Sequence, residues 1–356
     1  MQTQHFSLPH KIEFLQVLRF LAALSVSLFH FSVFYHYITP RTIYTVSFFV
    51  QLFFFISSFL TMHTTNTKEK GKHFFIRRLI RLIPLYWLLT IFTFFASCII
   101  PEIIGYKPTI IELFKSLFFI PYERASLKSD IILRSLVGLG HTIQMEIAFS
   151  LLFMIVMKIS HKNRGVLAII FCAFLSLLGK IFTFNNPILK FYITNNHITW
   201  ISFCAGILCY YLIIYISSKK LSIKKWYSTI LSFLLLALSC ILVHIFRKQI
   251  TTLNITAYCW CIIFILTMFF TIICSCFKLF SPKLLVSIGN ASFSYYLLHY
   301  YIISVGERIF GINDFSPRNI IIIISMIVLS WVISYISWYI IEKKFGNILS
   351  SIFLKN

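Results

Sequence analysis

Long apolar stretches separated by short polar connections dominate the chain. A membrane-spanning helix needs about 20 mainly apolar residues. Stretches of that length predict an all-α, polytopic membrane fold with about ten transmembrane helices, at 12–35, 43–62, 81–100, 136–158, 165–184, 198–217, 226–246, 254–277, 287–305 and 320–341. The ninth is the most polar because Gly289, Asn290 and several Ser and Tyr dilute it. We find no soluble domain and no repeat, so residues 1–356 are interpreted as a single transmembrane domain.

The connections predict the orientation of these helices. An even number of spans places both termini on one side of the membrane, and the connections then alternate between the two sides. Most Lys and Arg fall in one set of connections, including the clusters at 68–81 and 219–225. The positive-inside rule therefore predicts that both termini are cytoplasmic. The longest connection, about 101–135, lies on the other side, and its apolar part near 110–120 is too short to span, so we expect it to lie flat on the membrane or re-enter it.

Composition supports a membrane protein and argues against a soluble fold and a nucleic-acid-binding protein. Apolar residue types make up 59% of the 356 residues and charged types 12%, which is more apolar surface than a soluble fold buries. The net charge of +22 would suggest nucleic acid in a soluble protein, but here it follows the positive-inside pattern, so no nucleic-acid partner is expected. The nine Cys lie mostly inside apolar stretches, with i, i+2 pairs such as Cys259 and Cys261 that cannot share a helix face. We interpret them as core residues and expect no metal.

The first predicted span carries two ionisable residues, Arg19 and His30. Eleven residues make close to three helical turns, so both side chains are predicted on one face, about 16 Å apart along the axis. In one interpretation Arg19 reaches the cytoplasmic interface and His30 bonds a neighbouring helix. In the other, the two line a polar path through the bilayer, with a cation near the cytoplasm and a titratable base deeper in the membrane.

Three arginines cluster where the third predicted span begins, at Arg77, Arg78 and Arg81. Arg78 and Arg81 fall on one helix face. The cluster is typical of a cytoplasmic topology signal. It also suits a phosphate-binding site, because the guanidinium fork matches phosphate oxygens.

The fourth predicted span contains a carboxylate, Glu146, well inside the apolar stretch. An unpaired carboxylate there would be protonated, so Glu146 is expected to have an Arg or His partner. His141 and Gln144 lie nearer the outer end, where ordinary interfacial residues are often polar.

Taken together, these motifs resemble the membrane acyltransferase-3 family, whose members O-acylate sugars of surface polysaccharides, lipopolysaccharide and related glycoconjugates. The resemblance covers nearly the whole chain, in the order Arg19 with His30 (Arg-x10-His), 53–60 (Phe-Phe-x-x-Ser-Gly-Phe-Leu), Arg78 with Arg81 (Arg-x-x-Arg), Glu146 with Phe149 (Glu-x-x-Phe), Phe203 with Gly206 (Phe-x-x-Gly), 289–299 (Gly-x-x-Ser-Tyr-x-x-Tyr-x-x-His) and Glu342. Three positions depart from the family pattern: His141 replaces Trp, Ser58 replaces Gly, and Lys343 replaces Arg. None of the three removes a proposed catalytic group.

The resemblance implies a multi-pass acyltransferase domain, residues 1–356, in a bacterial plasma membrane. Its donor would be acetyl-CoA or another acyl-CoA, its acceptor a glycan or lipid-linked sugar, and its surroundings membrane lipids. In that reading Arg78, Arg81 and Arg77 hold the donor phosphates, Arg19 helps along the acyl path, and His30 is the base or the acyl-carrying nucleophile. Glu146 would orient His30 or pair with Arg19.

Two other classes of protein remain open from the residues alone. A glycolipid or polysaccharide transporter, or flippase, also places buried charges along a polar path. It needs no acyl donor and no paired cytoplasmic arginines. A non-catalytic membrane scaffold leaves Arg19, His30 and Glu146 without an explanation.

Overall fold

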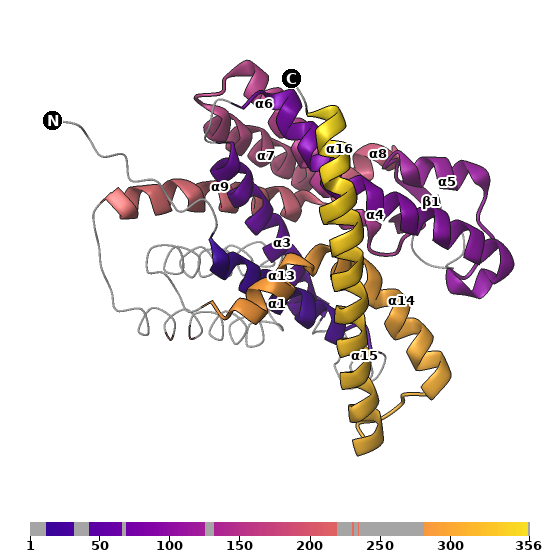
Figure 1. The fold of residues 1–356 in the computed structure, drawn as a ribbon. Helices are drawn as coiled ribbons and strands as arrows, with labels where there is room; N and C mark the ends of the chain where they lie inside the picture. Colours follow the sequence, from indigo (N-terminus) through magenta and orange to yellow (C-terminus); the bar gives the residue numbers. More distant parts are fainter. Residues whose placement is uncertain are drawn as a thin grey trace. The chain divides into compact units, whose positions relative to one another are not determined.

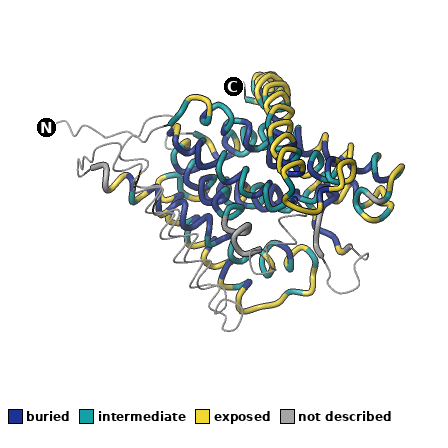
Figure 2. Tube along the Cα trace, turned by 90° about the horizontal axis from the view of Figure 1, so that it is seen from below, coloured by how far each residue is buried: buried dark blue, intermediate teal, exposed yellow. Residues whose placement is uncertain are grey.

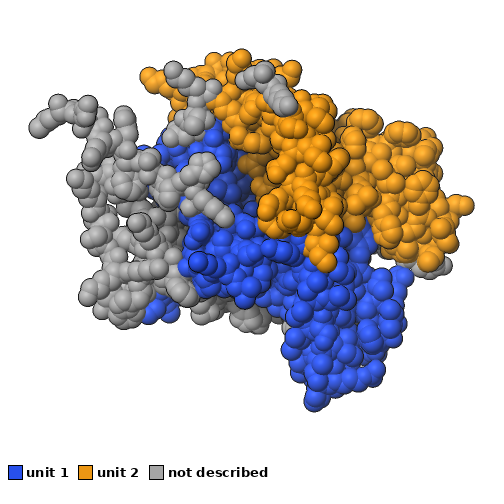
Figure 3. Space-filling model, in the orientation of Figure 1, with its two compact units in different colours: residues 1–66, 202–335 blue, residues 67–201, 336–356 orange. Residues whose placement is uncertain are grey.

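The computed structural model describes residues 12–31, 43–65, 69–124, 132–218 and 281–354, with the single residues Ile230 and Leu234. The chain divides into two compact units (Figure 3). Unit 1 comprises Met1–Asn66 and Ser202–Tyr335, and unit 2 comprises Thr67–Ile201 and Ile336–Asn356. The predicted span 254–277 lies outside the described residues, as does 226–246 apart from Ile230 and Leu234, and so do the cysteines at 259, 261, 274 and 276.

Unit 1 is built from apolar helices that cross at close range. They are α1 (Glu13–Leu28), α3 (Ile43–Thr64), most of α9 (His197–Ser218), α13 (Lys283–Asn290), α14 (Ser292–Phe310) and most of α15 (Pro317–Ser337). Helix α1 packs against α3, α13 and α14 (Figure 1). A Cβ at Gly206 on α9 would overlap Ser58 and the carbonyl of Phe55 on α3, and a Cβ at Gly289 would overlap the carbonyl of Gln16 on α1. Both crossings therefore depend on glycine.

Unit 2 is organised around two long helices, α4 and α6, which pack against each other. Its elements are α4 (Gly71–Ile99), η2 (Pro101–Ile103), α5 (Ile110–Leu117), β1 (Tyr122–Arg124), β2 (Ile132–Arg134), α6 (Gly140–Ile159), α7 (Arg164–Ile181), α8 (Pro187–Leu189), η3 (Lys190–Asn195), η4 (Trp338–Phe345) and α16 (Gly346–Phe353). Helix α4 begins ten residues before the predicted span at 81. The arginines end the apolar stretch there, but arginine is a good helix former and does not end the helix.

The connection between α4 and α6 contains a short helix and a β-hairpin. Helix α5 has a capping box, in which Thr109 accepts from the Glu112 backbone and the Glu112 side chain accepts from the Thr109 backbone. The last two carbonyls of α5 accept hydrogen bonds from side chains of α4. The donors are the Tyr86 hydroxyl and the Trp87 indole N–H, each at 2.9 Å. The antiparallel hairpin places Tyr122 opposite Arg134. The all-α prediction missed these strands because three residues are too few to show an alternating pattern.

Five described helices are long and apolar enough to cross a membrane: Gly71–Ile99, Gly140–Ile159, Arg164–Ile181, His197–Tyr215 and Pro317–Phe353. The last of these is mostly exposed (Figure 2), and the exposed side chains are largely apolar. Such a surface suits lipid rather than water. The membrane-type helical fold is thus confirmed, while the count of ten spans and the cytoplasmic termini stay predictions.

Two predicted spans differ in detail from the structure. The ninth, 287–305, is split between α13 and α14 at Ala291, next to the Gly289 and Asn290 that made it polar. The first was predicted to run over 12–35, but α1 ends at Leu28. This second difference changes the environment of His30.

Candidate functional site

His30 lies in a turn immediately after α1, rather than within a helix. The backbone N–H groups of His30 and Phe31 bond the carbonyls three residues back, those of Ser27 and Leu28, at 3.0 and 3.3 Å. An i to i−3 pattern tightens the chain and ends the α-helix. The prediction that a continuous helix carries both Arg19 and His30 is therefore wrong, while their position on one face stays a prediction.

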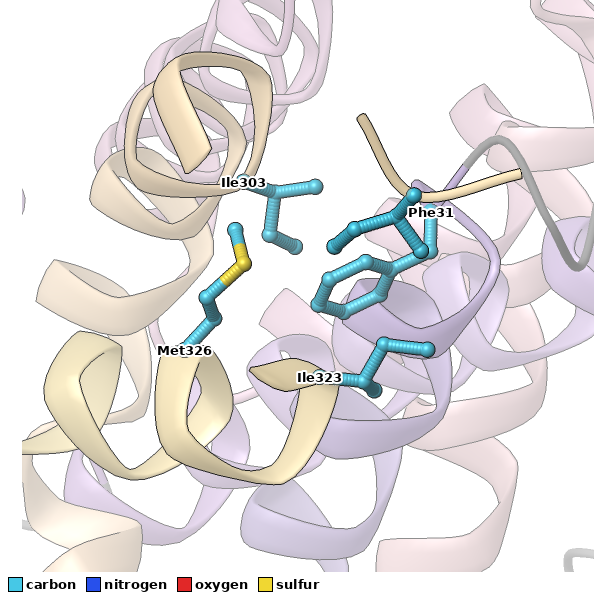
Figure 4. Close-up of a cluster of buried hydrophobic side chains, with 5 residues drawn as sticks. Phe31, Ile303, Ile323 and Met326 are labelled. Atoms are coloured by element: carbon cyan, nitrogen blue, oxygen red, sulfur yellow. The ribbon is translucent and has the colours of Figure 1, made fainter. Parts of the chain in front are cut away.

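The turn that carries His30 is fixed on both sides. On the α1 side, the Tyr295 hydroxyl of α14 donates a 2.6 Å hydrogen bond to the Ser27 Oγ. On the other side, Phe31 is fully buried in an apolar cluster with Ile303, Ile312, Ile323 and Met326. Figure 4 shows the Phe31 ring between side chains of α14 and α15. The backbone around His30 is thus held by packing and by a hydrogen bond.

A second imidazole, His299 of α14, lies beside His30. The two ring centroids are 5.2 Å apart, and the ring of Tyr300 lies edge-on to His30 at 5.5 Å. His299 is fully buried and its Nδ1 lies 2.8 Å from the carbonyl oxygen of Tyr295. A carbonyl only accepts, so Nδ1 carries a proton, and in the neutral ring that burial favours Nε2 carries a lone pair. Within the described part of the chain this Nε2 has no hydrogen-bond partner.

Arg19 lies on α1, about two and a half turns before the helix ends. Its side chain is 9% exposed, and Nη1 donates to the Gln16 Oε1 at 3.3 Å. A nearly buried guanidinium on an apolar helix must remain within reach of polar groups. Its predicted place on the acyl path stays a prediction.

In unit 2, Arg78 of α4 pairs with Glu146 of α6. Arg78 Nη1 lies 3.2 Å from Glu146 Oε1, with only 12% and 14% of the two side chains exposed. The guanidinium also lies over the ring of Phe74, 5.7 Å from its centroid. Glu146 thus has an arginine partner, as a carboxylate in a membrane helix requires. His30 and Arg19 belong to the other unit, so the pairing of Glu146 with either of them stays a prediction.

The other two arginines of the cluster differ from each other. Arg77 forms a two-pronged ion pair with Glu69, at 2.7 and 3.0 Å, and the same carboxylate accepts from the His73 Nδ1 at 2.7 Å. Arg81 is half-buried and has no hydrogen bond or ion pair within the part of the chain that the structure describes. Of the three predicted phosphate ligands, Arg81 therefore offers an uncommitted guanidinium.

Sequence reasoning left two of these groups outside the predicted site. His299 belongs to the 289–299 motif but received no role in the predicted site, because nothing in the sequence shows that it lies beside His30. Glu69 was not singled out, although its i, i+4 spacing to His73 is a recognisable helix pair. Glu69 can also contact Arg77, because Glu69 lies just before α4 begins.

A cavity of about 650 Å³ lies within unit 2 beside α6 and α7. Its lining is apolar and aromatic, and includes Phe119, Leu151, Phe174 and Trp200. The Tyr192 hydroxyl at its edge already donates to the Phe119 carbonyl at 2.6 Å, and burial raises the pKa of this phenol above its ordinary value. We therefore assign no acid–base chemistry to this cavity.

The fold and the buried polar groups define a multi-pass membrane protein with an imidazole pair in one unit and an arginine–carboxylate cluster in the other. Residues 12–337 match the family described as Acyltransferase domain, and this match runs through both units. The chain therefore belongs to the acyltransferase-3 family and is a membrane acyltransferase, as the motifs indicated. Neither the curated proteins nor the solved structures compared with it contain a match.

Proposed function

We propose that the protein is a membrane O-acyltransferase of a bacterial plasma membrane. It would transfer an acyl group, in the simplest case acetyl, from cytoplasmic acyl-CoA to a sugar hydroxyl of a surface polysaccharide, a lipopolysaccharide O-antigen or a related glycolipid. The family supports the acyltransferase class. The observation that carries the chemistry is His30, an imidazole in a packed turn beside a second, buried imidazole. Imidazole takes up and releases protons near neutral pH.

The proposed reaction is the attack of a hydroxyl on a thioester. The acceptor oxygen forms a bond to the thioester carbonyl carbon, and its proton passes to a ring nitrogen of His30. The carbon–sulfur bond then breaks, and the protonated His30 returns the proton to the leaving thiolate of CoA. The products are an O-acyl sugar and free CoA thiol, and His30 is neutral again.

A related route uses His30 as the nucleophile. The imidazole nitrogen would first attack the thioester carbonyl carbon, breaking the carbon–sulfur bond and releasing CoA thiolate, and would carry the acyl group. The sugar hydroxyl oxygen then takes the acyl group from the ring nitrogen, and the hydroxyl proton ends on the CoA thiolate. Purified protein incubated with acetyl-CoA without an acceptor separates the two routes. A mass gain of one acetyl group on a His30-containing peptide supports the carrier route, and its absence with full transfer to added acceptor supports the base.

The donor phosphates are proposed to bind the arginine cluster of α4. Arg81 is the main ligand in this proposal, because Arg77 and Arg78 already face Glu69 and Glu146. The Arg81 guanidinium is planar and always charged, and its donors match the geometry of phosphate oxygens. Arg19 is proposed to lie along the acyl path, and Glu146 to hold Arg78 in position.

The proposal is tested with the full chain in lipid nanodiscs. Acetyl-CoA labelled in its acetyl group is added together with a glycolipid extract of the host membrane. We expect the label to appear on the glycan and free thiol to appear in equal amount. Absence of label transfer would contradict the proposal, and movement of the glycolipid across a vesicle bilayer without any donor would identify a transporter instead.

A further inference from the structure

His299 has an unusual combination of properties for a residue in an apolar helix. It is fully buried, its tautomer is fixed by the Tyr295 carbonyl, and its Nε2 is unpartnered among the described residues. A buried acceptor without a donor has lost its hydrogen bonds to water and gained none in return, which costs free energy. Such atoms are therefore uncommon, and a transient hydrogen-bond donor is one explanation for them.

The surroundings of His299 hold its ring rigidly in place. Tyr295 stacks on it with centroids 5.3 Å apart, and Trp331 of α15 stacks on Tyr295 at 3.7 Å. The Tyr295 hydroxyl is itself bonded to Ser27 on α1. The ring therefore keeps a fixed orientation relative to the turn that carries His30.

His30 is the imidazole that lies next to His299. With centroids 5.2 Å apart, a nitrogen of His30 comes within hydrogen-bond distance of His299 when the His30 ring turns toward it. Catalytic hydrogen bonds are often longer before substrate binds and tighten in the complex. The phenol rings next to the pair are those of Tyr295, Tyr296 and Tyr300, and the cation on α1 is Arg19.

We propose that His299 is a positioning residue for His30, an inference that rests on the proposed function. Its Nε2 accepts the N–H of His30 and leaves the other nitrogen of His30 with the lone pair that receives the acceptor's proton. When His30 takes that proton, the hydrogen bond to His299 stabilises the imidazolium. His299 remains neutral throughout, so the proton count of the reaction is unchanged.

The test compares His299→Gln and His299→Phe with Trp331→Phe, in the full chain in nanodiscs. Trp331→Phe disturbs the same aromatic stack and removes no imidazole. We expect His299→Phe to lower kcat about 10- to 100-fold with KM for acyl-CoA within about twofold. The acid limb of the pH profile of kcat in His299→Phe should move to lower pH by about one unit, because the protonated His30 loses its hydrogen-bond acceptor. His299→Gln keeps an acceptor oxygen and should lie between His299→Phe and the parent.

A second readout does not depend on activity. The ¹⁵N chemical shifts of labelled histidine rings, recorded across pH without substrate, report the protonation of each ring. We expect His30 to titrate at lower pH in His299→Phe than in the parent. An unchanged His30 titration, or a loss of kcat matched by Trp331→Phe with no movement of the acid limb, would overturn the positioning role. If the parent shows the coupled titration but no acyl transfer, the proposed function fails and the imidazole pair stands.

Discussion

Unit 2 holds a largely buried ion pair of opposite charges, whereas unit 1 holds a buried imidazole beside a second imidazole. In unit 2, Arg78 lies 3.2 Å from Glu146. In unit 1, His299 is fully buried, donates from Nδ1 to a carbonyl, and lies beside another imidazole. A buried ion pair resists change, since removing one partner leaves an uncompensated charge. A neutral imidazole pair can take up one proton, and this contrast is the reason that we propose proton transfer in unit 1 and anion recognition in unit 2.

The largest expected effect follows from His30→Ala in unit 1. Loss of a general base lowers a transfer rate by about 100- to 10,000-fold. We expect acyl transfer to fall by that factor while the protein remains in the membrane. Labelled transfer in nanodiscs measures it.

His63→Ala is the matched control for His30→Ala. It removes another imidazole of unit 1. The His63 ring stacks on the ring of Phe59 in α3, with the two ring centroids 6.5 Å apart. Its transfer rate should stay within about twofold of the parent, because it takes no part in the proposed proton path. Retained activity in His30→Ala would remove His30 from the mechanism.

The second effect is on stability and belongs to unit 2. Glu146→Ala leaves Arg78 buried without its carboxylate and should cost about 3–5 kcal/mol of unfolding free energy. Denaturant unfolding in detergent measures this loss. The double variant Arg78→Met with Glu146→Leu should recover most of the stability but not the affinity for acyl-CoA. A double variant with normal KM would show that the pair is structural only.

The third effect is on donor binding. Arg81→Ala removes charge-assisted hydrogen bonds to phosphate, worth about 1.5–3 kcal/mol, and should raise KM for acyl-CoA about 10- to 100-fold. Steady-state kinetics at several acyl-CoA concentrations measures it. Lys72→Ala, an exposed cation on the same helix, is the control and should change KM about twofold or less. Equal effects of the two variants would mean that α4 attracts the donor by general charge alone.

The smallest effects come from a pair of variants with similar stability costs. Tyr295→Phe removes the hydrogen bond to Ser27, and Thr109→Ala removes the cap of α5, each costing about 1 kcal/mol. Only Tyr295→Phe loosens the turn that carries His30, so it alone should lower kcat. Transfer assays and thermal unfolding of both variants measure this. Equal kcat values would show that the Ser27 contact does not position His30.

Much of the helical architecture was predictable because apolar stretches of spanning length have few alternatives in a membrane. The predicted 136–158 and 198–217, for example, correspond closely to α6 and α9. The start of α4 was missed because hydropathy reports where lipid ends, not where a helix begins. The hairpin at Tyr122 was missed because it is too short to leave a pattern.

The candidate residues were easier to choose than their partners. An arginine, a histidine and a glutamate in apolar stretches stand out because an ionisable side chain in the membrane costs free energy. Their partners lie far along the chain, Arg78 68 residues from Glu146, and His299 on a different helix from His30. The end of α1 before His30 was also not predictable, because the apolar pattern continues to 35.

The central claim is that this protein acylates a sugar hydroxyl through His30. Mass spectrometry of surface glycans tests it most directly, in cells that lack the protein and in the same cells producing the parent or His30→Ala. We predict a mass step of one acyl group on a glycan with the parent, and none with His30→Ala or without the protein. Identical glycan spectra in all three, or the same step with His30→Ala, would contradict the account.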